Sequence, residues 1–256
     1  MSLFRRSRPE SELYGEVIET VELSPSMIRV VLGGDGLADF APEPYTDSYL
    51  NPLFVPEGSP LTPPFDPKAA RTLDRGQQPR PRRFNVGYAG SWAQRAAPGD
   101  RLQVSQPGGG YRPDPAADWH LLVGDESALP AIAASLEVMP DHAVGRVLVV
   151  VDGSDHELEL QRPPGVEVEW LHRRDHEHPD QALPDAVAAL EFLPGTPQLF
   201  VHGEAGETRT VRKHLKIDRN LDIDGASISP YWRRTYTDED WRKVKRQWIK
   251  DQARDG

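Results

Sequence analysis

Two short acidic loops in the second half of the chain carry the residue types best suited to chemistry. Each places a glycine and acidic residues directly after an apolar run, as Gly124-Asp-Glu-Ser127 and Gly203-Glu-Ala-Gly206. Parallel α/β sheets bind ligands in such loops, where buried strands end and helices begin. Neither loop is a Gly-x-Gly-x-x-Gly fingerprint, and the carboxylates of Asp125 and Glu126 would repel a pyrophosphate. We therefore expect the first loop to lie beside an uncharged part of a ligand. For the second loop, helix capping by Glu204 or Glu207 is the simpler interpretation.

Basic residues gather in two stretches of an otherwise acidic chain. The net charge is −10, yet residues 68–101 hold eight Lys or Arg against two acids, and residues 232–256 hold eight against five. A general nucleic-acid binder carries a basic field, so that class is excluded. Two basic islands indicate either a local anionic ligand, such as a phosphate, or arginines that only keep loops soluble.

The composition excludes several further classes. The 256 residues include no cysteine, which excludes a disulfide framework, a cysteine nucleophile and an iron–sulfur cluster held by cysteines. No apolar run approaches the roughly 18 residues of a membrane span, and the N-terminal segment lacks the apolar core of a signal peptide. We expect a cytoplasmic monomer that neither crosses a membrane nor binds nucleic acid.

The elements that must position these loops fall into two groups. In the first half, turns and alternating apolar residues predict short strands over residues 14–23, 27–32, 45–54, 82–86 and 101–105, which suit a small antiparallel barrel. In the second half, strands alternate with helices, which predicts a parallel sheet. Its strands are expected at 119–123, 146–151, 166–171, 198–202 and 226–229, and its helices at 130–139, 181–190 and 208–218. The fold class is an all-β antiparallel barrel followed by an α/β domain, with domains at 1–114 and 115–256.

The tail predicts one more helix. Thr237 can cap it, with Asp240 three residues on. Trp241, Val244 and Trp248 follow at a spacing of i, i+3 and i+7, which predicts one apolar face that docks on the body.

Longer motifs extend this pattern over most of the chain. They are Tyr45-Thr-Asp-Ser-Tyr49, Ser91-Trp-Ala-Gln-Arg-Ala-Ala-Pro-Gly-Asp100, Gly108-Gly-Gly-Tyr111, Asp118-Trp-His-Leu-Leu-Val-Gly-Asp-Glu-Ser-Ala-Leu-Pro-Ala-Ile132, Gly203-Glu-Ala-Gly-Glu207 and Ser229-Pro-Tyr-Trp-Arg-Arg234. In this order they resemble the siderophore-interacting protein family, from about Tyr14 to Arg234. The family consists of FAD-dependent ferric-siderophore reductases of the bacterial cytoplasm, with a ferredoxin-reductase-like fold.

The resemblance implies a function and a set of partners. It implies that the chain binds FAD, takes electrons from NADPH or NADH and passes them singly to iron(III) in a siderophore, which releases Fe(II). Reduced ferredoxin is an alternative donor, since a C-terminal helix over the flavin face would hinder a nicotinamide. Two other functions stay open: a general NAD(P)H:flavin or quinone reductase, and a non-catalytic siderophore-binding protein that has lost FAD.

The resemblance also implies site residues. Arg82 neutralises a flavin phosphate, Phe84 packs on the flavin, the segment from Gly87 takes the pyrophosphate, and Asp125 and Glu126 lie by the flavin or nicotinamide ring. The expected cofactor residues are Arg82, Phe84, Asn85, Val86, Gly87, Tyr88, Ala89, Gly90, Ser91, Trp92, Asp125, Glu126, Ser127 and Trp232. The residues expected to attract an anionic siderophore are Arg233, Arg234, Lys243 and Lys245. No catalytic acid or base is expected.

One departure from the family lies within the flavin segment. In the family a hairpin separates the Arg-x-Tyr-Ser/Thr strand from the small-residue loop, whereas here Val86 is followed at once by Gly87. Phe84 and Asn85 also replace the family's Tyr and Ser/Thr. We expect the hairpin to be either deleted or a segment omitted from the sequence.

Two other constellations are weaker candidates. His172, His176 and His178 lie in a polar loop, but their spacing fits no zinc-ligand scheme, so we expect no metal. Ser154, Asp155 and His156 are triad residue types, yet adjacent residues cannot form a triad.

The expected role of Arg82 yields a first prediction. Arg82→Ala should weaken FAD binding by ~1.5–3 kcal/mol, the contribution of a charge-assisted hydrogen bond to a phosphate. A titration of the apoprotein with FAD measures the change. An unchanged affinity would remove Arg82 from the flavin site.

Overall fold

The computed structural model describes residues 13–81 and 88–252, which form two compact units. The first unit takes most of the chain up to Gly109. The second takes the chain from Gly110, together with residues 24–27 and 45–47 of the first half. This change of unit lies near the expected division after residue 114.

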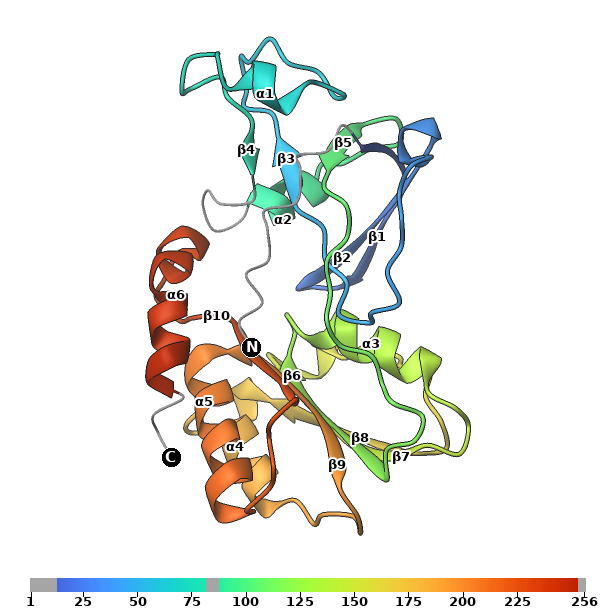
Figure 1. The fold of residues 1–256 in the computed structure, drawn as a ribbon, viewed down its shortest axis with the longest axis vertical. Coiled ribbons are helices and arrows are strands. Elements are labelled where there is room, and N and C mark those ends of the chain that lie inside the picture. Colours follow the sequence, from blue (N-terminus) through green and yellow to red (C-terminus); the bar gives the residue numbers. More distant parts are fainter. Residues whose placement is uncertain (1–12, 82–87, 253–256) are drawn as a thin grey trace. The chain divides into compact units, whose positions relative to one another are not determined.

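The first unit contains an antiparallel sheet of five strands in the order β2-β1-β5-β3-β4 (Figure 1). Its strands are β1 (Tyr14–Ser24), β2 (Met27–Gly33), β3 (Pro52–Phe54), β4 (Arg80–Pro81) and β5 (Arg101–Val104). β5 pairs with β1 on one side and with β3 on the other. Within the described residues β2 and β4 are edges, so the sheet is open where the sequence predicts a closed barrel. The expected strand at 82–86 lies outside the described residues.

The core of the first unit is small. Leu13, Phe54, Leu102 and Val104 form it, and Trp92 packs against Phe54 with ring centroids 6.0 Å apart. Trp92 belongs to α2 (Tyr88–Ala93). The strand expected over 45–54 shrinks to the three residues of β3, because its earlier part pairs only at the bridge between Tyr49 and Gly108.

A long loop joins β3 to β4 and contains the short helix α1 (Pro67–Ala70). Its middle is fastened by Gln103 on β5, whose side chain is fully buried. The Gln103 amide accepts a hydrogen bond from Phe65 N at 3.0 Å and donates one to Phe65 O at 2.9 Å. One side chain thus satisfies both backbone groups of a residue that has no strand partner.

The second unit contains a parallel sheet of five strands in the order β10-β9-β6-β7-β8, as the sequence predicts. Its strands are β6 (Trp119–Asp125), β7 (Val144–Val151), β8 (Gly165–His172), β9 (Pro197–Glu204) and β10 (Ser227–Trp232). Its helices are α3 (Leu129–Val138), α4 (Ala182–Ala189), α5 (Ala205–Lys213) and α6 (Asp238–Gln252). A π-helical turn, His214–Asp218, extends α5.

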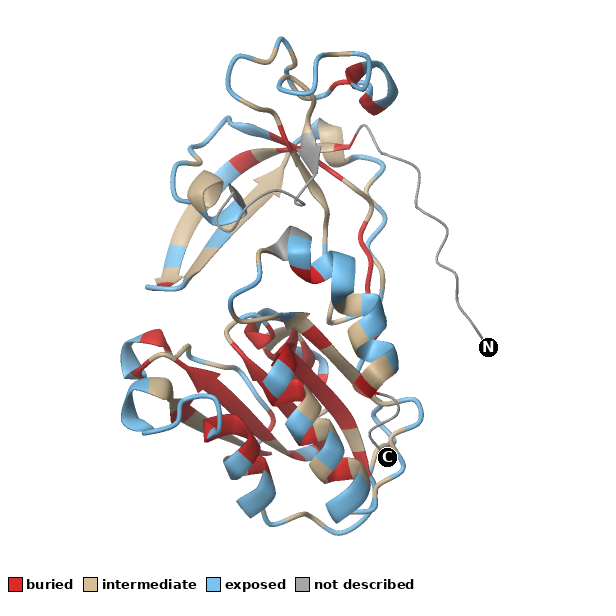
Figure 2. Cartoon of the chain, turned by 90° about the vertical axis from the view of Figure 1, so that its left-hand side faces the viewer, coloured by how far each residue is buried: buried red, intermediate tan, exposed pale blue. Residues whose placement is uncertain are grey.

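Both faces of the parallel sheet are covered, and all seven residues of β6 are buried. Leu122 belongs to the core that contains α3, whereas Leu121 and Val123 belong to the core that contains α4 and α5. Figure 2 shows these central strands as the main buried part of the unit. A continuous apolar run is the sequence pattern of such a strand.

The C-terminal helix docks on α5, but with a different face from the one expected. Trp241 is 1% exposed and its ring lies 5.6 Å from that of Trp248, while Val244 is 37% exposed. The inward positions are therefore 241, 245, 248 and 252, and the prediction for Val244 is wrong. Arg212 on α5 donates to the carbonyl of Gln252 at 3.2 Å, which fixes the end of α6.

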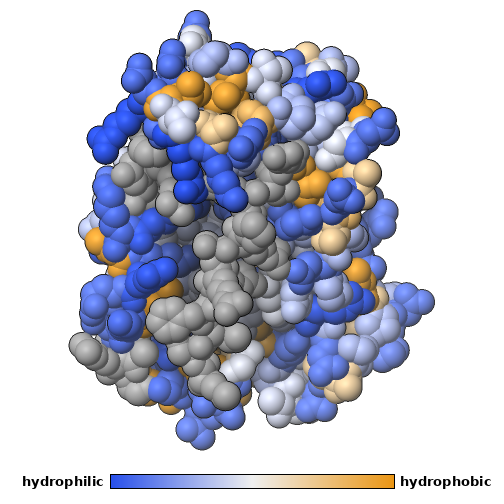
Figure 3. All heavy atoms as spheres, turned by 45° about the horizontal axis from the view of Figure 1, so that its top comes forward, coloured by the Kyte–Doolittle hydropathy of each residue, from blue (hydrophilic) through white to orange (hydrophobic). Residues whose placement is uncertain are grey.

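No described helix combines the length and the apolar character needed to cross a membrane. The face drawn in Figure 3 is mostly hydrophilic, with small separate hydrophobic patches.

Candidate functional site

The carboxyl edge of the parallel sheet contains a topological switch point between β6 and β9. The chain leaves β6 toward β7 and β8 on one side, while β9 is followed by β10 on the other. Loops diverge at such a point, and doubly wound folds bind ligands there. The two acidic loops singled out in the sequence follow these two strands, so the structure brings them together.

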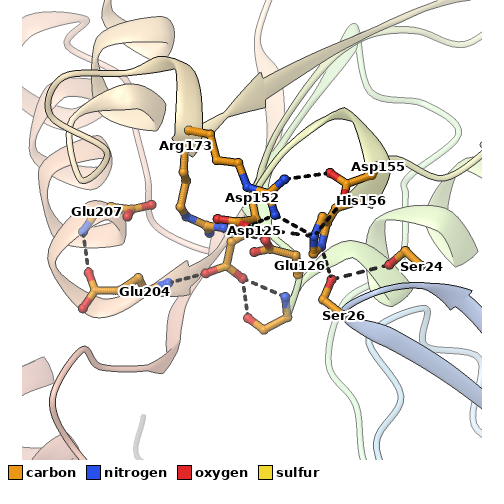
Figure 4. A network of polar contacts seen from close by, with 12 residues as sticks. Ser24, Ser26, Asp125, Glu126, Asp152, Asp155, His156, Arg173, Glu204 and Glu207 are labelled. Atoms are coloured by element: carbon orange, nitrogen blue, oxygen red, sulfur yellow. Dashed lines mark hydrogen bonds and ion pairs between the residues drawn. The ribbon is translucent and has the colours of Figure 1, made fainter.

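Asp125, at the end of β6, is the centre of this edge (Figure 4). One carboxylate oxygen, Oδ1, accepts from Ser127 N at 2.8 Å and from Ser127 Oγ at 2.5 Å. The other, Oδ2, accepts from Glu204 N at 2.9 Å and from Trp232 Nε1 at 2.7 Å. A single buried carboxylate therefore joins the ends of β6, β9 and β10 to the segment that opens α3. Burial raises the pKa of Asp125, and these hydrogen bonds oppose that effect.

Two glycines make this close approach possible. Gly203 has φ +145°, and a Cβ there would lie 2.7 Å from Asp125 Oδ2. At Gly124 a Cβ would lie 2.5 Å from the Cβ of Ala128 and 2.9 Å from the carbonyl of His202. Any larger residue at either position would push β6 and β9 apart, so each loop needs its glycine for packing.

Glu204 begins α5 as the sequence predicts for a capping residue. Its Oε2 accepts from Gly206 N at 2.5 Å and Glu207 N at 3.1 Å. The other oxygen, Oε1, accepts from Arg234 N at 3.1 Å, which ties the segment after β10 to the same helix end.

Glu207 is a buried acid in the first turn of α5. Its carboxylate pairs with the guanidinium of Arg234, and its exposed fraction is only 2%. Burial raises the pKa of Glu207 to about 7, although Arg234 favours the ionised form. The charge of Glu207 therefore changes near neutral pH.

Glu126 and Arg173 form an ion pair across the sheet edge, with Arg173 Nη1 2.5 Å from Glu126 Oε1. Arg173 follows β8 directly. Two buried polar atoms here have no partner among the described residues: the donor Arg173 Nη2 and the acceptor Glu207 Oε2. A carboxamide offers both an acceptor and a donor, so the nicotinamide amide fits this pair chemically.

The structure gathers some of the expected cofactor residues and leaves others apart. Asp125, Ser127 and Trp232 share one network, and Glu126 lies beside it. Residues 82–87 lie outside the described residues, and with them Arg82, Phe84, Asn85, Val86, Gly87 and the bond between Val86 and Gly87. Ala89 and Gly90 are exposed on α2. This helix has only six residues, and its role toward a pyrophosphate stays a prediction.

The expected siderophore residues are partly engaged within the second unit. Arg234 pairs with Glu207, and the guanidinium of Arg233 stacks over Tyr236 at 4.6 Å. Lys243 lies 3.1 Å from Asp240 on the same helix, and Lys245 lies on the inward side of α6. Arg233 and Arg234 therefore shape the segment after β10, and their role toward a siderophore stays a prediction.

The histidine-rich loop forms ordinary side-chain pairs. His172 Nε2 lies 2.6 Å from Glu157 and its Nδ1 3.3 Å from Asp175. The described part of the chain contains no cluster of three or more His, Cys, Asp or Glu side chains arranged to hold a metal.

Sequence reasoning missed one residue of the site, Arg173, and it missed that Arg234 pairs with Glu207. Arg173 directly follows a predicted strand of the parallel sheet, so its place at the carboxyl edge was available as a signal. The pairing of Arg173 with Glu126 could not be predicted, because β8 lies two strands away from β6 in the sheet.

Comparison with known proteins agrees with this geometry. A family model for the siderophore-interacting protein matches residues 117–235, and one for the siderophore-interacting FAD-binding domain matches residues 16–89. The chain is thus similar to one family over both of its units.

Three relatives span nearly the whole chain. An uncharacterized protein of Mycobacterium tuberculosis is 38% identical, covering 93% of this chain and 96% of its own. The ferric vibriobactin reductase ViuB of Vibrio cholerae is 30% identical, covering 87% and 90%. The NADPH-dependent ferric-chelate reductase of Escherichia coli is 24% identical, covering 84% and 91%.

Solved structures agree on the fold. The siderophore-interacting protein SipS from Aeromonas hydrophila superimposes with a TM-score of 0.73 at 24% identity, covering 93% of this chain and 97% of its own. A ferredoxin-NADP+ reductase from Plasmodium falciparum has a TM-score of 0.57 at 11% identity, covering 83% and 92%. The fold is therefore ferredoxin-reductase-like, as the sequence predicts.

The Asp125 network yields a stability prediction. Asp125→Asn should lower the free energy of unfolding by about 3 kcal/mol, because an amide turns donors toward buried donors. Urea unfolding measures the loss, with Asp141→Asn in an exposed turn as the matched control. A loss as small as the control's would show that the network is dispensable.

Glu207 yields a prediction about pH. The folded-state pKa lies above the unfolded value of 4.5, so its contribution to stability is present below pH 4.5 and is lost as the pH rises toward 7. Glu207→Gln mimics the protonated form and should gain about 1–3 kcal/mol relative to wild type between pH 5 and pH 8. Urea unfolding at several pH values measures this. If the free energy of unfolding changed with pH in the same way in both proteins, the raised pKa of Glu207 would be contradicted.

Proposed function

Because this chain belongs to the siderophore-interacting protein family, we propose that it is an FAD-dependent reductase of ferric siderophores that uses NAD(P)H. The single observation that carries the proposal is the switch-point site. There Asp125, Ser127 and Trp232, all expected cofactor residues, form one network, and Arg173 Nη2 and Glu207 Oε2 are buried with no hydrogen-bond partner among the described residues. The ferric-reductase relatives support the choice of substrate.

The chemistry needs a bound flavin and no protein acid or base. When bound, FAD takes two electrons as hydride from NAD(P)H and can pass them on one at a time. The overall reaction is NAD(P)H + 2 Fe(III) → NAD(P)⁺ + H⁺ + 2 Fe(II). Fe(II) binds hard oxygen ligands far less tightly than Fe(III), so the chelate then releases its iron. A cytoplasmic location is part of the proposal, since that compartment supplies NAD(P)H.

The residues of the site bind and orient. Arg173 and Glu207 would hold the nicotinamide carboxamide, since Arg173 Nη2 supplies one donor for it and Glu207 Oε2 one acceptor. Asp125 holds Trp232 and the two glycine loops in place. The basic residues Arg233 and Lys243 add positive charge that attracts an anionic ferric siderophore.

The main test is reduction of ferric chelates by the purified protein. With FAD and NADH or NADPH, we expect Fe(II) formation from ferric siderophores to exceed reduction of free flavin and of quinones, measured with an Fe(II)-specific chelator. Faster turnover of free flavin or quinone would identify a general reductase instead. A protein that neither purifies with flavin absorption nor takes up added FAD would be a non-catalytic binder.

A second donor, reduced ferredoxin, is favoured by one observation. Helix α6 exposes basic residues, including Arg246 and Lys250, on the side away from Trp241. An acidic electron-transfer protein is steered by such a face.

Charge reversal tests this donor. Arg246→Glu with Lys250→Glu should slow reduction by ferredoxin by ~10-fold at low salt and remove its salt dependence, while reduction by NAD(P)H stays unchanged. Arg29→Glu, an exposed reversal in the first unit, is the control. Equal ferredoxin rates in all three proteins would contradict docking on α6.

A further inference from the structure

We propose that the end of β7 selects NADH over NADPH, with Asp152 as the residue that recognises the adenosine ribose. This inference rests on the proposed use of NAD(P)H and adds which dinucleotide the site accepts. It starts from topology. β7 lies beside β6, with Val150 in register with Asp125, and Asp152 follows β7 directly. In doubly wound folds an acidic residue beyond the first βα unit binds the ribose hydroxyl of NAD.

The surroundings of Asp152 are built around one arginine. Arg174 Nη2 lies 2.6 Å from Asp152 Oδ2, and Arg174 Nη1 lies 3.1 Å from Asp155 Oδ1. A Cβ at Gly153 would lie 3.1 Å from Arg174 Nη1 and 2.9 Å from Asp155 Oδ1. Glycine at this position therefore leaves room for the guanidinium between the two acids.

Asp152 keeps an acceptor available for a ligand. Among the described residues, its carboxylate contacts Arg174 and, at 3.9 Å, His156 Nε2, and both contacts are made by Oδ2. The side chain is 46% exposed, so it is open to a ligand. A ribose 2′-hydroxyl can donate to this carboxylate, which is the contact that distinguishes it from a phosphate.

The charge around this position opposes a 2′-phosphate. Five carboxylates lie at the ends of β6, β7 and β8 or pair with residues there. The same region contains only two of the described arginines. The acids are Glu126, Asp152, Asp155, Glu157 and Asp175, and the arginines are Arg173 and Arg174. Each arginine is already bonded to an acid. A 2′-phosphate, with a charge of about −2, would have to break those pairs and lie among carboxylates.

The test is direct binding rather than turnover. Isothermal titration calorimetry on the full-length, FAD-loaded protein, with NAD⁺ and NADP⁺ as probes, gives both affinities without hydride transfer. We expect NAD⁺ to bind at least ~10-fold more tightly. Asp152→Ser should weaken the binding of NAD⁺ and reduce the preference for NAD⁺ over NADP⁺ to less than ~3-fold. Asp141→Ser, an exposed acid before the amino end of β7, should keep the wild-type ratio.

Each outcome separates this inference from the proposed function. Tighter binding of NADP⁺, equal binding of both, binding of neither, or an unchanged ratio in Asp152→Ser would overturn the inference. The wild-type ratio decides even if Asp152→Ser fails to fold. Ferric-siderophore reduction by chemically reduced flavoprotein is measured separately. If the flavoprotein does not reduce ferric siderophores but binds NAD⁺ more tightly than NADP⁺, the proposed function is wrong and the inferred selectivity for NADH is retained.

Discussion

The structure of the second unit depends on the buried carboxylate of Asp125, whose charge must be compensated by hydrogen-bond donors. An ionised acid in an apolar interior is costly unless nearly every lone pair has a donor. Asp125 meets this requirement with donors from Ser127, Glu204 and Trp232, which belong to three different segments. The requirement therefore fixes where three strands end and where α3 begins. The two glycine loops follow as a consequence, since only glycine lets β9 approach this close.

The charges of the site follow from this constraint. A pyrophosphate at a helix start normally takes free backbone N–H groups. Here the N–H of Ser127 and those of Gly206 and Glu207 are already bonded to acidic side chains. These N–H groups are thus not available to a phosphate, while Arg173 Nη2 and Glu207 Oε2 are buried with no hydrogen-bond partner among the described residues. This division supports assigning a ring rather than a phosphate to the edge.

Much of the second unit could be predicted from the sequence, because β6, β7 and β9 are short apolar runs that alternate with helical segments. The sequence also singled out the first loop and Trp232 as candidates, although it could not show the hydrogen bonds that join them. The predictions that were wrong concerned features that depend on tertiary contacts. The inward face of α6 contains position 245 and not Val244, since Trp248 packs with Arg209 on α5 and Trp241 packs against Trp248. The strand expected from residue 45 is limited to β3, because Tyr49 has only a single bridge. Arg173 reaches Glu126 only because the sheet order places β8 on the same side as β7.

The fastening of the β3–β4 loop by Gln103 has an evolutionary consequence. The two ends of the loop are paired in the sheet, at Leu53 with Pro81, and its middle is held at Phe65. Chain length on either side of Phe65 can therefore change without disturbing the strands. Each doubling of a flexible loop costs only ~0.6 kcal/mol of closure entropy. Lineages can accumulate insertions and deletions here while Gln103 and the backbone of Phe65 stay constant, so this loop is where related chains should diverge most in length.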